Sequence, residues 1–338
     1  MSKMPRAPSQ FKSESALEET STHDLIQQLE GLVSEGRNPN TMKLDTLSTC
    51  DLLKVINQED QKVALAVANE LPNITAAVNF AVSSIQNGGR LIYVGAGTSG
   101  RLGVLDAVEC RPTFGVNDDL VVGIIAGGEK AIIHAVEGAE DCKESGIKDL
   151  QYIALTHNDM VVGIAASGRT PYVISALEYA NSLGCNTASV VCNPTSPMLK
   201  IADAGICAQV GPECITGSTR MKSGTAQKLI LNMLSTATMV KLGKVFENLM
   251  VDVNASNQKL RARAIRIVMQ ATQCGQEQAQ LSLEQADSSA KLAILMILTN
   301  TDASTAKAML QNNQGHLRNA LEGLSHNSKK SPKGKTEI

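Results

Sequence analysis

The sequence has few aromatic residues, no tryptophan and no excess of either charge. Aromatic residues make up 2% of the 338 positions, which argues against a site where bases or sugar rings stack on aromatic side chains. The formal net charge is -2 and the body of the chain has no blocks of like charge, so nothing indicates a nucleic-acid surface. No apolar run is long enough to span a bilayer. We therefore expect an aliphatic core and neither nucleic acid nor membrane as a partner.

Paired cysteines and a secretion signal are also lacking. The eight cysteines form no C-x-x-C pair and show no zinc-like spacing with histidine, so we expect reduced, mostly buried thiols and no metal site. Residues 1–20 are polar and lack the apolar segment of a signal peptide. These features predict a cytoplasmic protein that begins with a polar tail.

What the chain does have is an alternation of strand-like and helical patterns. Apolar runs of strand length occupy residues 91–94, 120–126, 160–166, 187–192 and 205–210. This spacing predicts an α/β fold with a parallel sheet of about five strands flanked by helices. Ligands of such sheets bind beyond the carboxyl ends of the strands, so functional residues are expected just after each strand.

Helical patterns surround this region and suggest the domain limits. Helices are predicted over residues 46–57, 60–86 with a kink at Pro72, and 223–242, and a small helical bundle over 257–324. We divide the chain into a polar tail with a lead-in helix (1–43), a catalytic domain (44–250), a C-terminal helical domain (251–325) and a disordered basic tail (326–338).

A glycine-rich turn follows the first strand. Thr98, Ser99, Gly100 and Arg101 stand where the strand gives way to a helix, and this order of elements favours an anion site at the helix start. The turn also fits the G-x-G-x-x-G pattern of dinucleotide-binding sites. That pattern needs an acidic residue at the end of the next strand, about 20 residues further on. Here the next strand ends later, which leaves only Glu129 as a late candidate.

A second turn of the same kind follows the strand at 160–166. It contains Ser167, Gly168, Arg169 and Thr170, and Pro171 is suited to the first position of a helix. Thr170 alone is equally well explained as a helix cap. Two hydroxyl-rich turns that each carry an arginine suit a phosphomonoester better than a pyrophosphate, which glycine backbone normally holds.

A third polar turn lies before the predicted helix at 223–242. Ser218 and Lys222 are its candidate anion ligands. A capped helix with solvated cations explains this turn equally well.

Two carboxylates are candidates for general acid/base chemistry. Glu109 falls on the same helical stripe as Leu102 and Leu105, and Glu140 repeats that spacing in the next helical segment. Partial burial would raise the pKa of such a carboxyl and suit it to proton donation. From spacing alone, a solvated carboxylate is the more common outcome for both residues.

Together these residues resemble the N-acetylmuramic acid 6-phosphate etherases, a bacterial branch of the sugar-isomerase (SIS) fold. The resemblance extends from about residue 44 to 324. It is most specific in LIYVGAGTSGRLGVLDAVEC (91–110), VVGIAASGRTPYVI (161–174) and TGSTRMKSGTAQKLILNMLST (216–236).

The resemblance implies cleavage of the D-lactyl ether of the phosphosugar, giving N-acetylglucosamine 6-phosphate and D-lactate, without metal or nucleotide. It also implies a homodimer whose two subunits share the active site. The family's catalytic glutamates correspond to Glu109 and Glu140. Its phosphate-binding residues correspond to Thr98, Ser99, Ser167, Arg169 and Thr170.

One departure and two alternatives accompany this resemblance. Arg111 occupies a position where the family usually has proline, and a cation there would lower the pKa of a nearby carboxyl. A non-catalytic sugar-phosphate regulator, similar to the glucokinase regulatory proteins, is one alternative, although those proteins resemble two tandem units. A phosphosugar isomerase is the other.

Overall fold

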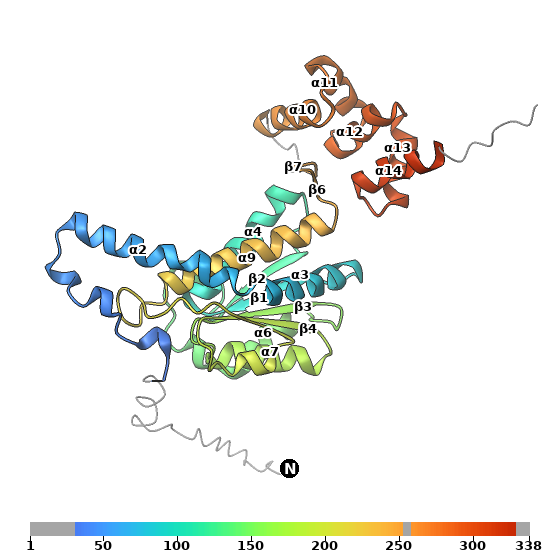
Figure 1. Cartoon of the computed structure of the whole chain (residues 1–338). Coiled ribbons are helices and arrows are strands. Elements are labelled where there is room, and N and C mark those ends of the chain that lie inside the picture. The colour runs from blue at the N-terminus through green and yellow to red at the C-terminus, as the bar shows by residue number, and fades with distance from the viewer. Residues whose placement is uncertain (1–30, 253–257, 329–338) are drawn as a thin grey trace, which may run out of the picture.

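The computed structural model describes residues 31–252 and 258–328, and side chains as far as residue 323. At its centre lies a parallel sheet with strand order β2-β1-β3-β4-β5 (Figure 1). Its strands are β1 (Leu91–Gly95), β2 (Val121–Ile125), β3 (Met160–Ile164), β4 (Asn186–Val191) and β5 (Ala204–Cys207). The predicted α/β fold and its five strands are confirmed.

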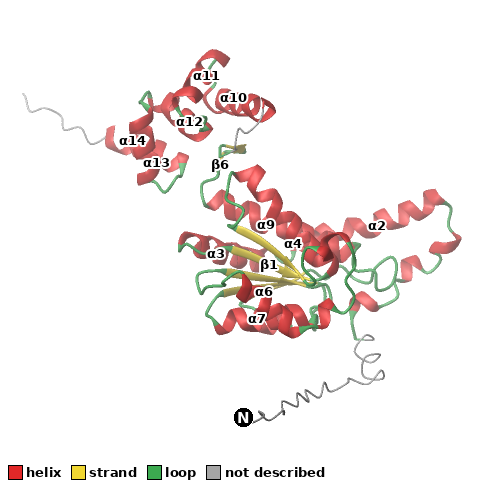
Figure 2. Ribbon diagram, turned by 180° about the vertical axis from the view of Figure 1, so that it is seen from behind, coloured by secondary structure: helices red, strands yellow, loops and turns green. Residues whose placement is uncertain are grey.

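Helices cover both faces of the sheet, which explains why the strands read as continuous apolar runs. Leu91 and Tyr93 face one side, and Ile92 and Val94 face the other. The first side is covered by α3 (Leu71–Gln86), α4 (Gly97–Phe114) and α9 (Lys222–Lys241), and the second by α6 (Lys143–Tyr152) and α7 (Pro171–Ser182) (Figure 2). Short helices complete this domain: α5 (Lys130–Ile133), η4 (Ala139–Asp141) and α8 (Met198–Ile201).

The helical region before the sheet differs from the prediction at its break. Helix α2 (Thr49–Ala68) packs on α9 and ends before α3 begins, so the expected kinked helix over 60–86 is two helices. Pro72 lies in the first turn of α3, where its missing N–H costs nothing. Ser48 accepts a hydrogen bond from the backbone N–H of Asp51 and caps α2.

The segment just before α2 folds against the main domain. It forms three short 3-10 turns, η1 (Val33–Glu35), η2 (Pro39–Thr41) and η3 (Leu44–Thr46). Leu32, Ser34 and Asn38 are buried within it. The predicted tail over residues 1–20 lies outside the described residues. The described part of the predicted tail and lead-in helix, residues 31–43, is therefore packed against the main domain as 3-10 turns.

The C-terminal helices have a core of their own, centred on residues such as Val268, Ile294 and Leu295. The hairpin of β6 (Val245–Phe246) and β7 (Leu249–Met250) contributes Phe246 to that core. The helices are α10 (Gln258–Thr272), α11 (Gln276–Gln285), α12 (Ala290–Thr299), α13 (Ala303–Asn312) and α14 (Leu317–Ser328). In the described part of the chain, no helix combines the length and apolar character needed to cross a membrane.

Candidate active site

The turns that follow β1 and β3 lie side by side at the carboxyl end of the sheet. The two strands are neighbours, and Gly95 at the end of β1 is paired in register with Ile164 at the end of β3. Between the turns is a cavity of about 410 Å³. Five of the predicted phosphate ligands line it: Thr98, Ser99, Ser167, Arg169 and Thr170. The structure therefore brings together the two turns that the sequence predicted as anion sites.

The turn after β1 brings the start of α4 close to the strand. A side chain at Gly100 would place its Cβ 2.7 Å from the carbonyl oxygen of Gly95, so Gly100 has a packing role. Thr98 lines the cavity, and so does Ser99, whose hydroxyl donates to Oε1 of Gln227 on α9 at 2.9 Å. The unpaired N–H groups at the start of this helix also favour an anion.

Arg101 does not line this cavity. Its Nε donates to the backbone carbonyl of Ile132 at 2.9 Å, which ties α4 to α5. It lines instead an adjoining cavity of about 240 Å³. The predicted phosphate contact from Arg101 therefore has no support in this geometry, because its guanidinium is engaged with the loop after β2.

The turn after β3 leaves its threonine hydroxyl uncommitted. Thr170 is the residue before α7, but its side chain makes no capping hydrogen bond. The Ser167 hydroxyl accepts from the backbone N–H of Arg169 at 3.2 Å. Gly168 has φ +65°, and a Cβ there would lie 1.9 Å from Oγ of Ser196, so the tight turn requires glycine. Hydroxyls and a guanidinium are thus presented to the cavity by a rigid turn.

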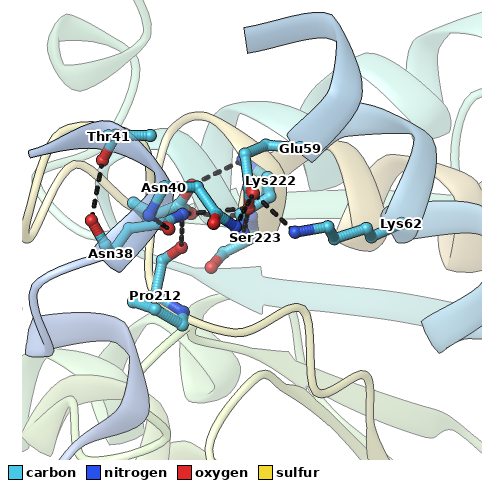
Figure 3. Close-up of polar contacts among 9 residues, drawn as sticks. Asn38, Asn40, Thr41, Glu59, Lys62, Pro212, Lys222 and Ser223 are labelled. Atoms are coloured by element: carbon cyan, nitrogen blue, oxygen red, sulfur yellow. Dashed lines mark hydrogen bonds and ion pairs between the residues drawn. The ribbon is translucent and has the colours of Figure 1, made fainter. Parts of the chain in front are cut away.

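The third polar turn is built differently. Lys222 is 1% exposed, and its Nζ lies 2.8 Å from Oε2 of Glu59 on α2 (Figure 3). Buried Glu213 accepts the backbone N–H groups of Lys222 and Ser223, each at 2.9 Å, at the start of α9. Lys222 does not line the cavity and its ammonium is buried in an ion pair, so this geometry gives the predicted substrate contact from Lys222 no support.

Ser218 in the same turn is not among the residues that line the cavity, whereas its neighbour Thr219 is. Thr219 is not among the residues that the sequence pattern predicted. The hydroxyl-rich composition of the turn was the signal that could have found it. Spacing alone does not show which of two adjacent hydroxyls faces a cavity.

Glu59 is the centre of this buried polar cluster. Burial by itself would raise the pKa of the Glu59 carboxyl, but hydrogen bonds from Lys222, Lys62, Asn40 and Asn38 hold it well below its ordinary value. Glu59 is therefore ionised at neutral pH. Figure 3 shows how the cluster joins α2, the 3-10 turns and the start of α9.

The two predicted catalytic glutamates are placed very differently. Glu140, in η4, lines both the cavity between the turns after β1 and β3, called the main cavity below, and the adjoining cavity that Arg101 lines. Glu109 is exposed on α4 and lines neither. Arg111, beside it in sequence, forms an ion pair with Asp118. Of these two glutamates, Glu140 alone lines the cavity within one chain.

Glu35, at the end of η1, is a further carboxylate in the main cavity. Glu35 lies in the predicted lead-in region and is not among the predicted site residues. No motif or spacing links it to the strands, so only the fold shows its position.

Three protein-family models match parts of this chain. Residues 73–181 match the N-terminal SIS domain of glucokinase regulatory protein, and residues 140–237 match the SIS domain family. Residues 247–290 match the C-terminal lid domain of glucokinase regulatory protein. The two SIS matches include the turns after β1 and β3.

Three bacterial proteins named N-acetylmuramic acid 6-phosphate etherase are similar over most of their length. The chain is 58% identical to the one from Pseudoalteromonas atlantica over 88% of this chain and 97% of that protein. It is 60% identical to the one from Rhizobium rhizogenes over 88% and 97%. It is 58% identical to one from Actinobacillus pleuropneumoniae over 89% and 99%.

Proposed function

The chain belongs to the N-acetylmuramic acid 6-phosphate etherase family, and we propose that it cleaves the lactyl ether of that phosphosugar. The products are N-acetylglucosamine 6-phosphate and D-lactate. It is an enzyme of the carbon–oxygen lyase type. The observation that carries this proposal is one cavity that holds hydroxyls from two strand-end turns, Arg169 and the Glu140 carboxylate.

The cavity suits a phosphate at one side and proton transfer at the other. Ser167, Arg169 and Thr170 offer hydrogen-bond donors on the turn after β3, and Thr98 does so on the turn after β1. Held there, the phosphate would fix the open-chain sugar beside Glu140. Positioning of this kind supplies much of the rate advantage in reactions of bound substrates.

The chemistry needs two carboxyl groups that exchange roles. In the open-chain aldehyde, the carbonyl acidifies the proton on C2. A carboxylate removes that proton, the C3–oxygen bond breaks, and a carboxylic acid protonates the departing lactate oxygen. Water then adds at C3 of the unsaturated aldehyde and a proton returns to C2, so that the ether is hydrolysed overall. We assign Glu140 and Glu109 to these two roles, with Glu109 as the donor to lactate.

Glu109 would come from a second copy of the chain. It stands on a face of α4 and α5 with exposed apolar side chains, of which Leu105 is 47%, Val108 64% and Ile133 79% exposed. Apolar side chains gathered on one face are typical of a protein interface. A homodimer formed there would cover this patch and could bring Glu109 to the partner's cavity.

The two alternatives fit less well. Glucokinase regulatory protein is the source of two family matches, but the relatives that match 88% and 89% of the chain are named etherases. We also propose a cytoplasmic location, since all eight cysteines are free thiols and free thiols persist in a reducing compartment.

The test is incubation of the full chain with N-acetylmuramic acid 6-phosphate, with D-lactate and the sugar product both identified. We expect lactate release, and solvent deuterium at C2 of the product when the reaction runs in heavy water. Phosphosugar binding without release would favour the regulator, and a rearranged sugar that keeps its lactyl group would favour the isomerase.

Glu140→Gln should abolish release while phosphosugar binding persists. Glu178→Gln, an exposed position on α7, serves as the control with unchanged turnover. Full activity of the Glu140 variant would remove this residue from the mechanism.

A further inference from the structure

The Glu35 carboxylate shares the main cavity with Glu140 and Arg169 but lies on a different wall. It is carried by η1, which precedes the sheet by more than fifty residues in the sequence. Across residues 31–252 and 258–323, no side chain forms a hydrogen bond or ion pair with this carboxylate. A half-buried carboxylate that faces a cavity without a protein partner retains its full capacity to accept hydrogen bonds.

The turn that presents Glu35 is fixed by buried polar contacts. Asn193, which is fully buried after β4, accepts from the backbone N–H of Ser34 at 3.3 Å and donates to the Ser34 hydroxyl at 3.2 Å. The backbone N–H of Gly217 donates to the Ser34 carbonyl at 3.4 Å. Buried amide groups make such contacts because unsatisfied ones are costly. The position of Glu35 is therefore set by the main domain.

A second set of contacts fixes the same segment at Asn38, three residues after Glu35. Asn38, 3% exposed, donates from Nδ2 to Glu59 at 2.9 Å and to the Pro212 carbonyl at 3.1 Å (Figure 3). Glu59 is in turn paired with Lys222. The buried ion pair thus acts on the cavity indirectly, by holding η2, the turn that follows Glu35.

The loop before α9 leaves room for this carboxylate. Gly217 has φ +75°, and a Cβ there would lie 2.9 Å from Oε2 of Glu35. A larger residue would be strained in that backbone conformation and would push the carboxylate aside. Gly217 therefore lets Glu35 keep its place in the wall.

The charge of Glu35 indicates which part of the substrate it meets. A carboxylate would repel the phosphate and the carboxylate of the lactyl group, and it accepts hydrogen bonds only. Among the remaining polar groups of the phosphosugar, the donors are its neutral hydroxyls and its amide N–H. We propose that Glu35 is a substrate-binding residue that accepts a hydrogen bond from a hydroxyl of the sugar chain. This inference rests on the proposed function.

The test compares Glu35→Gln and Glu35→Ala with the wild type in D-lactate release from N-acetylmuramic acid 6-phosphate. Loss of a hydrogen bond to a charged group should lower kcat/KM by about 10- to 100-fold, mainly through KM. Glu178→Gln is the matched control, and thermal unfolding should show all variants folded. Inhibition by inorganic phosphate should not weaken in either variant, because Glu35 is not a phosphate ligand and its negative charge repels phosphate. Unchanged KM in both variants would overturn the proposal.

Two further measurements complete the design. If the 4-hydroxyl is the donor, a 4-deoxy analogue should bind the wild type more weakly than the substrate does, but should bind Glu35→Ala as tightly as the substrate does. Equal losses of affinity in both proteins for every deoxy analogue would overturn the assignment to a hydroxyl. If the wild type releases no lactate, the proposed function fails on its own. Calorimetric binding of N-acetylglucosamine 6-phosphate to the same variants then still decides whether Glu35 binds sugar.

Discussion

The turn after β3 and the loop before α9 look alike in sequence, but their basic side chains have different surroundings. Residues 167–170 and 217–222 are both rich in hydroxyls, both contain glycine at positive φ, and both carry basic residues at the start of a helix. In the first, Ser167, Arg169 and Thr170 line the cavity. In the second, Lys222 is buried against Glu59.

The difference lies in a partner that is distant in the sequence. Glu59 is 163 residues away from Lys222, and a buried cation needs a partner because an unpaired one is very costly. A polar turn at a helix start therefore indicates a candidate anion site. Its basic side chain is available to a ligand only when no buried carboxylate pairs with it.

Lys222→Met should break this contrast most strongly. Because it leaves the buried Glu59 carboxylate without its main cation, we expect the free energy of unfolding to fall by about 3–5 kcal/mol. Urea denaturation measures this, with Lys228→Met, exposed on the same helix, as the control. The double variant Glu59→Leu/Lys222→Met should regain part of the loss. A stable Lys222→Met protein with weakened phosphosugar affinity would instead make the loop a ligand site.

Acid should act on the same pair with a smaller effect. The folded-state pKa of Glu59 is lowered, so its contribution to stability is complete above the unfolded value of about 4.3 and is lost as pH falls through the folded value. We expect the midpoint of urea unfolding to fall more steeply below about pH 4 in the wild type than in the Glu59→Leu/Lys222→Met variant. Parallel curves would mean that the pair does not govern acid stability.

Thr170→Ala should reveal the opposite behaviour in the turn after β3. Its hydroxyl makes no capping bond, so unfolding free energy should change by less than about 0.5 kcal/mol. Loss of one hydrogen bond to the phosphate should raise KM about 2- to 10-fold. A destabilised variant with unchanged KM would show that Thr170 is a cap and not a ligand.

Ser218→Ala should have the smallest effect and sharpens the comparison within the loop before α9. Ser218 does not line the cavity whereas Thr219 does, so we expect KM for the phosphosugar to stay within about 2-fold of the wild type. Thr219→Ala, measured in the same assay, should raise KM more than Ser218→Ala does. The reverse order would place Ser218 in the site.

The sequence predicted those features whose signals are local. The strands followed from continuous apolar runs, and the turn after β3 followed from SGRTP placed at a strand end. The break between α2 and α3 was missed because apolar residues keep helical spacing across it. The burial of Lys222 and the position of Glu35 in the cavity were not predicted, for one reason. Both depend on contacts between segments far apart in the chain.

The pairing of Glu59 with Lys222 also has a consequence for synthesis on the ribosome. Translation adds roughly 5–20 residues per second, and 163 residues separate the two partners. On that scale Glu59 leaves the ribosome about ten seconds or more before the cation that neutralises it. Until then the charged Glu59 carboxylate favours solvent. The segment that carries Glu35, although synthesised early, should therefore be among the last parts of the cavity to reach its folded position.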